Sequence, residues 1–111
     1  MSLASAARVR DAAPLFAALG DATRLRLLLR LSAHGPESIA RLSDKSEVSR
    51  QAITKHLEVL AKAGLVRGSR RGRERIWQLE AARLSDARDY LEGISRQWDD
   101  ALERLKNFVE V

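Results

Sequence analysis

The chain has 111 residues, of which 45% are hydrophobic and only 5% aromatic, and its net charge is +5 at neutral pH. This length predicts one domain with a small aliphatic core, and a domain of this size gains stability from dimerisation. The positive charge favours an anionic partner such as nucleic acid. The absence of cysteine excludes disulfides, thiolate metal sites and thiol redox sensing.

The first twenty residues lack an apolar run long enough for a signal peptide or a membrane span. We therefore expect a cytoplasmic protein without membrane contact. Residues 8–19 have helical spacing, and Pro14 either begins the packed part of that helix or kinks it. Gly20 ends the helix.

Asp21 is a good N-cap for a second helix, which Gly35-Pro36 terminates. A nearly all-apolar pattern predicts that this helix is central, through Leu25, Leu28, Leu29 and Leu31. A third helix is expected from Ser38 to Leu42 or Asp44, with Ile39, Ala40 and Leu42 facing inward.

Residues 43–49 are expected to form a turn, after which Ser49 can cap a fourth helix over Arg50 to Ala63. Its buried stripe is predicted at Ile53, Leu57, Leu60 and Ala61. Gly64 fits the left-handed position that closes such a helix. Strands at 65–70 and 73–80 then form a hairpin around Arg71-Gly72. Alternation does not decide whether Ile76 or Trp77 points inward.

The polar face of the fourth helix is suited to the major groove of DNA, where recognition helices read bases with their N-terminal residues. Gln51 can pair with adenine and Arg50 with guanine, each through two hydrogen bonds. Ser49 suits a phosphate, Thr54 a phosphate or a thymine methyl, and His56 lies on the flank. The predicted DNA contacts of this helix are Ser49, Arg50, Gln51, Thr54, Lys55 and His56.

The hairpin carries five arginines against a single glutamate, Glu74. Arginines at a hairpin tip suit a narrow minor groove or the flanking phosphates. Arg70, Arg71 and Arg73 are the predicted contacts, whereas Arg67 and Arg75 lie nearer the base. A helix that can enter a groove beside such a hairpin is what a winged helix-turn-helix DNA-binding domain requires.

A long helix over residues 82–109 repeats apolar residues at alternating spacings of three and four. This heptad rhythm predicts a seam along another helix, and the short helices of one domain cannot cover it. We expect a dimer in which the seam packs on its symmetry mate and on the first helix. Trp98 would anchor it or line an effector pocket. The predicted interface residues are Leu15, Phe16, Leu84, Leu91, Ile94, Trp98, Leu105 and Phe108.

The stretches GDATRLRLLLRL (20–31) and SRQAITKHLEVLAKAGLV (49–66), with the arginine-rich hairpin, resemble the ArsR family of bacterial transcription regulators. The resemblance covers roughly residues 10–110. It implies a homodimeric repressor that pairs through its terminal helices and loses operator affinity when an effector binds. Metal-sensing members often carry a cysteine motif where this chain reads ESIARLSDKS (37–46), and others use histidines on the last helix, which here has none. The resemblance therefore implies a member without these metal sites.

We predict a mainly α chain with a small β-hairpin, in the order α-α-α-α-β-β-α. It forms a single winged helix-turn-helix domain over residues 1–111, with the recognition helix at 49–63, the wing at 65–80 and the dimerisation helix at 82–109. It would bind a pseudo-palindromic DNA operator as a homodimer, with half-sites about 34 Å apart or a multiple of that. The alternative is a protein-interaction module with weak, sequence-blind DNA binding.

We expect no catalytic, metal or cofactor site. Ser49 and His56 lie two helical turns apart, too far for a nucleophile–base pair, and His34 is expected to be a solvent-facing loop residue. The controlling signal stays open between a small organic effector near the dimer interface, a carboxylate-bound ion and no ligand. Protonation, a change of oligomer and partner binding are equally open.

Overall fold

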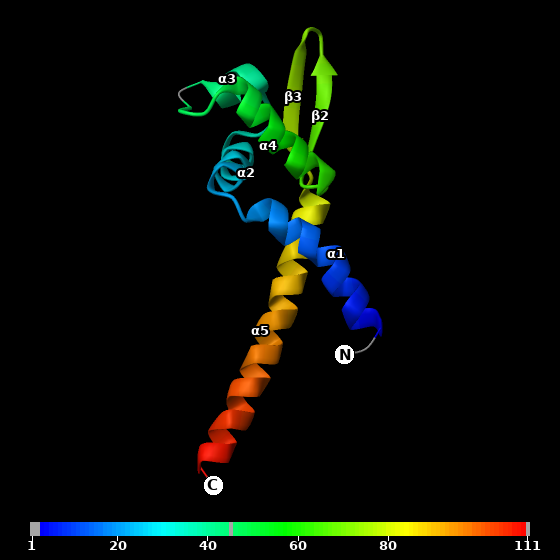
Figure 1. Cartoon of the computed structure of the whole chain (residues 1–111), viewed down its shortest axis with the longest axis vertical. Helices are drawn as coiled ribbons and strands as arrows, with labels where there is room; N and C mark the ends of the chain where they lie inside the picture. The colour runs from blue at the N-terminus through cyan, green and yellow to red at the C-terminus, as the bar shows by residue number, and fades with distance from the viewer. Residues whose placement is uncertain (1–2, 45, 111) are drawn as a thin grey trace.

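The computed structural model describes residues 3–44 and 46–110. The predicted domain (1–111) and the predicted turn (43–49) also include residues outside this described part, namely 1, 2, 45 and 111. A long C-terminal helix projects from a small helical body that carries a β-hairpin at its other end (Figure 1). This confirms the predicted mainly α fold. The elements are α1 (Leu3–Leu19), α2 (Ala22–His34), β1 (Glu37–Ser38), α3 (Ile39–Ser43), α4 (Arg50–Lys62), β2 (Val66–Arg71), β3 (Glu74–Leu79) and α5 (Ala81–Glu110).

The first helix is longer than predicted, because α1 begins at Leu3 rather than near residue 8. Pro14 therefore lies inside the helix, and the expectation that it begins the packed part is wrong. The corner that follows matches its sequence signals. Asp21 caps α2 by accepting a hydrogen bond from the Arg24 backbone N–H at 3.0 Å, and Gly35 ends α2 with a positive φ of 76°.

The second helix is only partly central. Leu27, Leu28 and Leu31 are buried, as part of the core that α2 shares with α1, α4 and the sheet. Leu25 and Leu29 belong to the apolar pattern that predicted a central helix, but they are 45% and 69% exposed. The all-apolar pattern hid which face packs, because leucine occupies both faces of the helix.

The predicted turn between α3 and α4 has helix signals on both sides. Ser38 caps α3 through the Arg41 N–H, and Ser49 caps α4 through the Ala52 N–H at 3.2 Å. Ile39 is half-buried and Leu42 is buried, whereas Ala40 is exposed and not inward as predicted. The predicted stripe of α4 is confirmed: Ile53, Leu57 and Leu60 are fully buried and Ala61 is half-buried.

Helix α4 ends in a Schellman motif, in which the Leu65 N–H bonds to the Leu60 carbonyl and the Gly64 N–H to the Ala61 carbonyl, both at 2.9 Å. Gly64 has the positive φ of 79° that this motif requires. The chain turns there into β2, so the end of α4 fixes where the hairpin starts.

The hairpin belongs to a three-stranded antiparallel sheet of order β1-β3-β2. Arg71 pairs with Glu74, so the turn residues are Gly72 and Arg73, one position later than predicted. Trp77 is the inward residue, at 1% exposed, and Ile76 is half-buried. The short strand β1 was not predicted; its Glu37 is buried and accepts a hydrogen bond from Arg30 Nε of α2 at 2.7 Å.

The last helix extends well beyond the rest of the molecule. The molecule measures 67 × 29 × 20 Å, and its radius of gyration is 18.4 Å, whereas a compact domain of this length has about 13 Å. Helix α5 spans 30 residues, about 45 Å at 1.5 Å per residue, and α1 crosses it only near its beginning (Figure 1). Most of α5 therefore has no cover from its own described chain.

Candidate nucleic-acid interface

One face of α4 is polar and open to solvent. Arg50, Gln51 and Lys55 are exposed there, and the buried stripe on the opposite side fixes this orientation. A shallow surface depression joins five side chains of this face: Arg50, Gln51, Thr54, Lys55 and Glu58. Donors and an amide stand side by side at the start of the helix, which is the part that reads bases in helix-turn-helix proteins, and the Glu58 carboxylate follows farther along the same face.

Glu58 was missed by the sequence reasoning. It follows Thr54 by four residues and Gln51 by seven, so helical periodicity alone places it on the same face. A carboxylate on a groove-facing helix accepts a hydrogen bond from the cytosine amino group and is repelled by phosphate. Its position toward the C-terminal end of the face separates it from the first-turn donors.

The two hydroxyl groups of this face already have partners within the chain. The Ser49 hydroxyl accepts the Ala52 N–H, which leaves its own proton free to donate. The Thr54 hydroxyl donates to the Arg50 carbonyl at 2.9 Å. Thr54 therefore offers a methyl group and an acceptor rather than a donor, which favours the predicted thymine methyl over a phosphate.

His56 is held against the rest of the domain. Its Nδ1 lies 3.3 Å from Arg24 Nη1 and 3.8 Å from Asp21 Oδ2, and its side chain is 25% exposed. The backbone N–H of Arg24 has the largest effect on the pKa of Asp21 and lowers it; burial opposes this effect, and the positive charge of Arg24 adds to it. The DNA contact predicted for His56 would therefore compete with an internal partner if it were made through Nδ1.

The five arginines of the hairpin divide into two groups. Arg67 pairs with Glu80 at 3.2 Å, and the Arg75 guanidinium lies over the Trp77 ring, 4.5 Å from its centroid. Arg70, Arg71 and Arg73 are exposed at the end of the hairpin, and among the described residues none of them has an ion-pair or side-chain hydrogen-bond partner. These three are the ones predicted from sequence to contact DNA.

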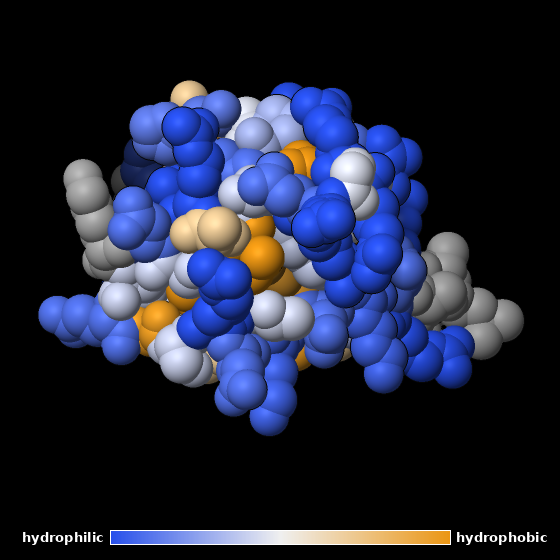
Figure 2. All heavy atoms as spheres, turned by 90° about the horizontal axis from the view of Figure 1, so that it is seen from above, coloured by the Kyte–Doolittle hydropathy of each residue, from blue (hydrophilic) through white to orange (hydrophobic). Residues whose placement is uncertain are grey.

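The hairpin and the α3–α4 region lie at the same end of the molecule, opposite the C-terminal end of α5 (Figure 1). Viewed from that end, the surface is mostly hydrophilic, with only small apolar areas between the charged groups (Figure 2). A hydrophilic, arginine-rich end suits the phosphate backbone of a nucleic acid.

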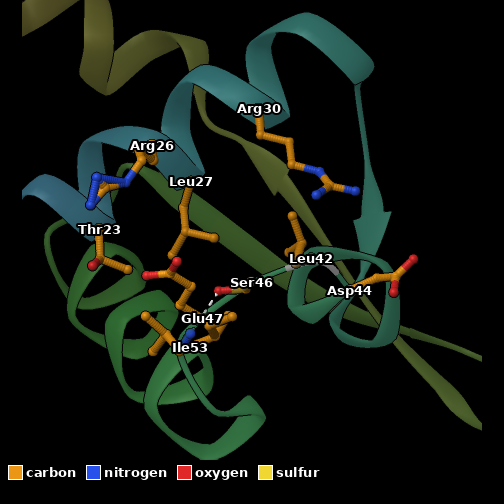
Figure 3. A pocket seen from close by; sticks show the side chains of 10 residues that line it. Thr23, Arg26, Leu27, Arg30, Leu42, Asp44, Ser46, Glu47 and Ile53 are labelled. Carbon is orange, nitrogen blue, oxygen red and sulfur yellow. Dashed lines mark hydrogen bonds between the residues drawn. The ribbon is translucent and has the colours of Figure 1, made fainter.

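Behind α4, a cleft separates α2 from the turn that precedes α4 (Figure 3). Core side chains, including Leu27 and Ile53, line it beside Arg26 and Glu47. Within the turn, the Val48 N–H donates to the Ser46 hydroxyl at 3.1 Å. This bond tightens the turn and so helps to orient the first residues of α4.

Two half-buried arginines connect α4 to the terminal helices. Arg24 Nε donates to the Ala18 carbonyl at 2.6 Å, so Arg24 joins the end of α1 to His56 of α4. Arg83 Nε donates to the Ala63 carbonyl at the end of α4 at 3.2 Å, and its Nη2 donates to the Asp11 carbonyl of α1 at 2.9 Å. The side-chain hydrogen bond to Asp11 raises the pKa of Arg83.

The role of Arg83 was not foreseen, because nothing in the local sequence indicates that the first turn of α5 contacts both α4 and α1. Arg24 belongs to the GDATR stretch, whose function in the corner becomes visible only in three dimensions. There, Asp21 caps one helix and Arg24 caps the carbonyl end of the other.

The side chains predicted for a dimer interface fall into three classes of exposure. Leu15 is 1% exposed and belongs to the core of its own chain, so it has almost no surface left for a partner. Phe16, Leu84 and Ile94 are half-buried, and the Phe16 ring packs on Tyr90 with 5.6 Å between centroids. The remaining ones are exposed: Leu91 53%, Trp98 69%, Leu105 58% and Phe108 81%.

Within residues 3–44 and 46–110, no helix is long and apolar enough to cross a membrane. The same described part of the chain contains no group of three or more histidine or acidic side chains arranged to hold a metal ion.

Comparisons with known proteins place this geometry in a family. A family model for a helix-turn-helix domain matches residues 19–69. The HTH-type transcriptional regulator Rv2034 of Mycobacterium tuberculosis is 40% identical over 93 residues, which cover 84% of this chain and 83% of the relative.

Solved structures share the whole architecture. An ArsR-like transcriptional regulator from Rhodococcus sp. RHA1 is similar over 89% of this chain and 92% of its own, with a TM-score of 0.77 and 37% identity. The homodimeric winged helix-turn-helix domain Mb0332 from Mycobacterium bovis shares the fold over 87% of this chain and 91% of its own, with a TM-score of 0.66 and 21% identity. The chain therefore belongs to the ArsR family of winged helix-turn-helix proteins and is a DNA-binding transcriptional regulator.

Proposed function

We propose that this regulator is a homodimeric repressor that binds a pseudo-palindromic operator. In each subunit, α4 enters the major groove, and Arg50, Gln51, Thr54 and Lys55 face the bases and nearby phosphates. The observation that carries the proposal is the combination of this open polar face with three hairpin arginines at the same end of the molecule, which have no ion-pair partner among the described residues.

The hairpin supplies affinity rather than base reading. Arg70, Arg71 and Arg73 reach the minor groove or the phosphates that flank the α4 site, and each phosphate contact releases counterions. Ser49 donates its free hydroxyl proton to a phosphate beside the start of α4. The N–H groups of the first helical turn add to that contact.

The dimer forms through the uncovered apolar side of α5, with the first helix beside it. Leu91, Trp98, Leu105 and Phe108 repeat along α5 and are more than half exposed in the single chain. Exposed apolar side chains in such a row mark an interaction surface. The Mycobacterium bovis domain of the same fold is homodimeric, which supports this arrangement.

In this proposal, the chain is a single domain, with α4 as the recognition helix, the hairpin as the wing and α5 as the dimerisation helix. The protein acts by binding rather than by catalysis, and it works in the cytoplasm, where its operator is located. An effector that binds near the dimer interface would lower operator affinity through the Arg24 and Arg83 connections.

The test is selection of bound duplexes from a random DNA pool, followed by affinity measurements at several salt concentrations. The proposal predicts a two-fold symmetric site bound about a thousand-fold or more above random DNA. Transcription in vitro from a promoter that carries this site should then fall when the protein is added. Weak binding without any sequence preference, together with capture of a different protein by α5, would favour the interaction module instead.

A further inference from the structure

The inner flank of α4 is joined to the α1–α2 corner by a small polar network. His56 Nδ1 meets Arg24 Nη1 at 3.3 Å and Asp21 Oδ2 at 3.8 Å. The same guanidinium donates to the carbonyls of Ala18 and Ala17, at 2.6 Å and 3.3 Å. We call Asp21, Arg24 and His56 the corner network. It connects the helix that faces DNA with the end of α1.

The chemistry of this contact determines which tautomer of the ring can form the hydrogen bond. An arginine guanidinium has five N–H donors and no acceptor, so the imidazole must accept through Nδ1. This hydrogen bond therefore requires the neutral tautomer, which has no proton on Nδ1 and carries its proton on Nε2. Protonation would point an N–H at the guanidinium and bring two positive charges to within 3.3 Å.

A charged ring has an alternative partner close by. Asp21 Oδ2 is 3.8 Å from Nδ1, but the same oxygen accepts the Arg24 backbone N–H that caps α2. That N–H, and then nearby positive charge, lower the pKa of the Asp21 carboxyl, which favours its ionised form. Within residues 3–44 and 46–110, the charged groups recorded in contact with the ring are Asp21 and Arg24. Helix α1 takes part through its Ala17 and Ala18 backbone carbonyls, which accept from Arg24 rather than from the ring.

We propose that His56 is a positioning residue for DNA reading: its neutral ring holds α4 in the orientation that binds the operator, and protonation exchanges Arg24 for Asp21 and releases that hold. This rests on the proposed function, since it assumes that α4 reads bases. A recognition surface must be held to about half an ångström by such supporting hydrogen bonds. Histidine is the side chain whose charge ordinarily changes between pH 5 and 8.

The test compares the affinity for the selected operator with that for a shuffled duplex between pH 7.5 and 5.5, at constant ionic strength. Any added positive charge strengthens binding to both duplexes, so this general electrostatic effect cancels in the ratio of the two affinities. The key variant is His56→Asn, because its side-chain oxygen can take the place of Nδ1 and accept from Arg24 at every pH. The control is His34→Asn, which removes an exposed histidine at the end of α2.

The proposal predicts that the ratio for the unmodified protein falls about tenfold on acidification, the scale expected when a charge-assisted hydrogen bond is broken. The ratio for His34→Asn should fall equally, and His56→Asn should keep its neutral-pH ratio throughout. A constant ratio in the unmodified protein, or an equal fall in His56→Asn, overturns the proposal.

Two further measurements separate this proposal from the proposed function. If no duplex is preferred even at pH 7.5, the proposed function fails, and this proposal fails with it. If a preference exists, the ¹⁵N NMR chemical shifts of the His56 ring at pH 7.5 show which ring nitrogen carries the proton, and this measurement needs no variant. A neutral ring with its proton on Nε2 supports the proposal, and a proton on Nδ1 contradicts it.

Discussion

The arginines of the hairpin have different surroundings although they lie within nine residues of each other. Arg67 and Arg75 are engaged by Glu80 and Trp77, and this engagement organises the base of the hairpin. Arg70, Arg71 and Arg73 extend from its end without a partner among the described residues. An arginine bound within its own chain loses part of its capacity to bind phosphate, so the three distal residues should dominate the electrostatic contact.

Replacing Arg70, Arg71 and Arg73 by alanine should weaken binding to all DNA sequences alike. The slope of log affinity against log salt should become shallower by about one for each phosphate that the hairpin no longer touches. Fluorescence anisotropy at four salt concentrations measures it. Arg67→Ala is the matched control on the same hairpin and should keep nearly the full slope; an unchanged slope in the triple variant would rule out the phosphate contacts.

Replacing Gln51 by alanine should change which sequence is preferred rather than the salt dependence. A bidentate base contact discriminates by about 1–3 kcal/mol against the wrong base. Repeating the duplex selection with Gln51→Ala should relax one position in each half-site. Lys62→Ala, in the last turn of the same helix, should select the original site. Relaxation in both variants, or in neither, would count against Gln51 as a base-reading residue.

At the scale of elements, the hairpin depends on a close approach between its two strands. Gly68 pairs with Trp77, and a Cβ at Gly68 would lie 2.9 Å from Arg75 Nε and 3.1 Å from the Trp77 ring. The ring is fully buried and is covered by the Arg75 guanidinium. A side chain at residue 68 would therefore have to displace this stack.

Gly68→Ala should lower the free energy of unfolding by about 1–3 kcal/mol, the usual cost of overpacking. Urea denaturation at fixed protein concentration measures it. Gly20→Ala is the control, because its added Cβ would meet only ordinary contacts at 3.5 Å. Equal stability of Gly68→Ala and the unmodified protein would show that the stack can move aside at no cost.

The sequence predicted the elements that carry strong local signals. Caps at Asp21 and Ser49, glycines at Gly35 and Gly64 and the stripe of α4 all appear as expected. The strand β1 could not be predicted, because two residues have no periodicity and depend on pairing with β3. The exposed faces of Leu25 and Leu29 were likewise hidden, since a helix with leucine on both faces does not indicate which one packs.

For the candidate site, the exposed donors of α4 and the hairpin were predictable from periodicity and composition. The internal partner of His56 and the bridging contacts of Arg83 were not, because they join residues 20 to 72 positions apart. Long-range polar contacts leave no local pattern in a single sequence.

At the scale of the molecule, α5 is a long arm along which Leu91, Trp98, Leu105 and Phe108 remain exposed. Trp98→Glu should place a charge in the proposed dimer interface. Loss of an interface anchor costs at least about 2 kcal/mol of binding free energy, so the dimer should associate about 30-fold or more weakly. Sedimentation velocity measures the change, with circular dichroism to verify the fold. Glu103→Lys, on the opposite side of α5, is the control for altered charge and should remain dimeric. A dimer that survives Trp98→Glu unchanged would place the interface elsewhere.

The central claim is that two subunits read one symmetric DNA site together. The most direct test is native mass spectrometry of the protein on the selected duplex, combined with affinity for a duplex in which one half-site is scrambled. We predict two chains on the symmetric duplex and a loss of about a hundredfold or more when one half is scrambled, because several base-pair mismatches act together. One chain per duplex, with equal affinity for the intact and half-scrambled sites, would contradict the account.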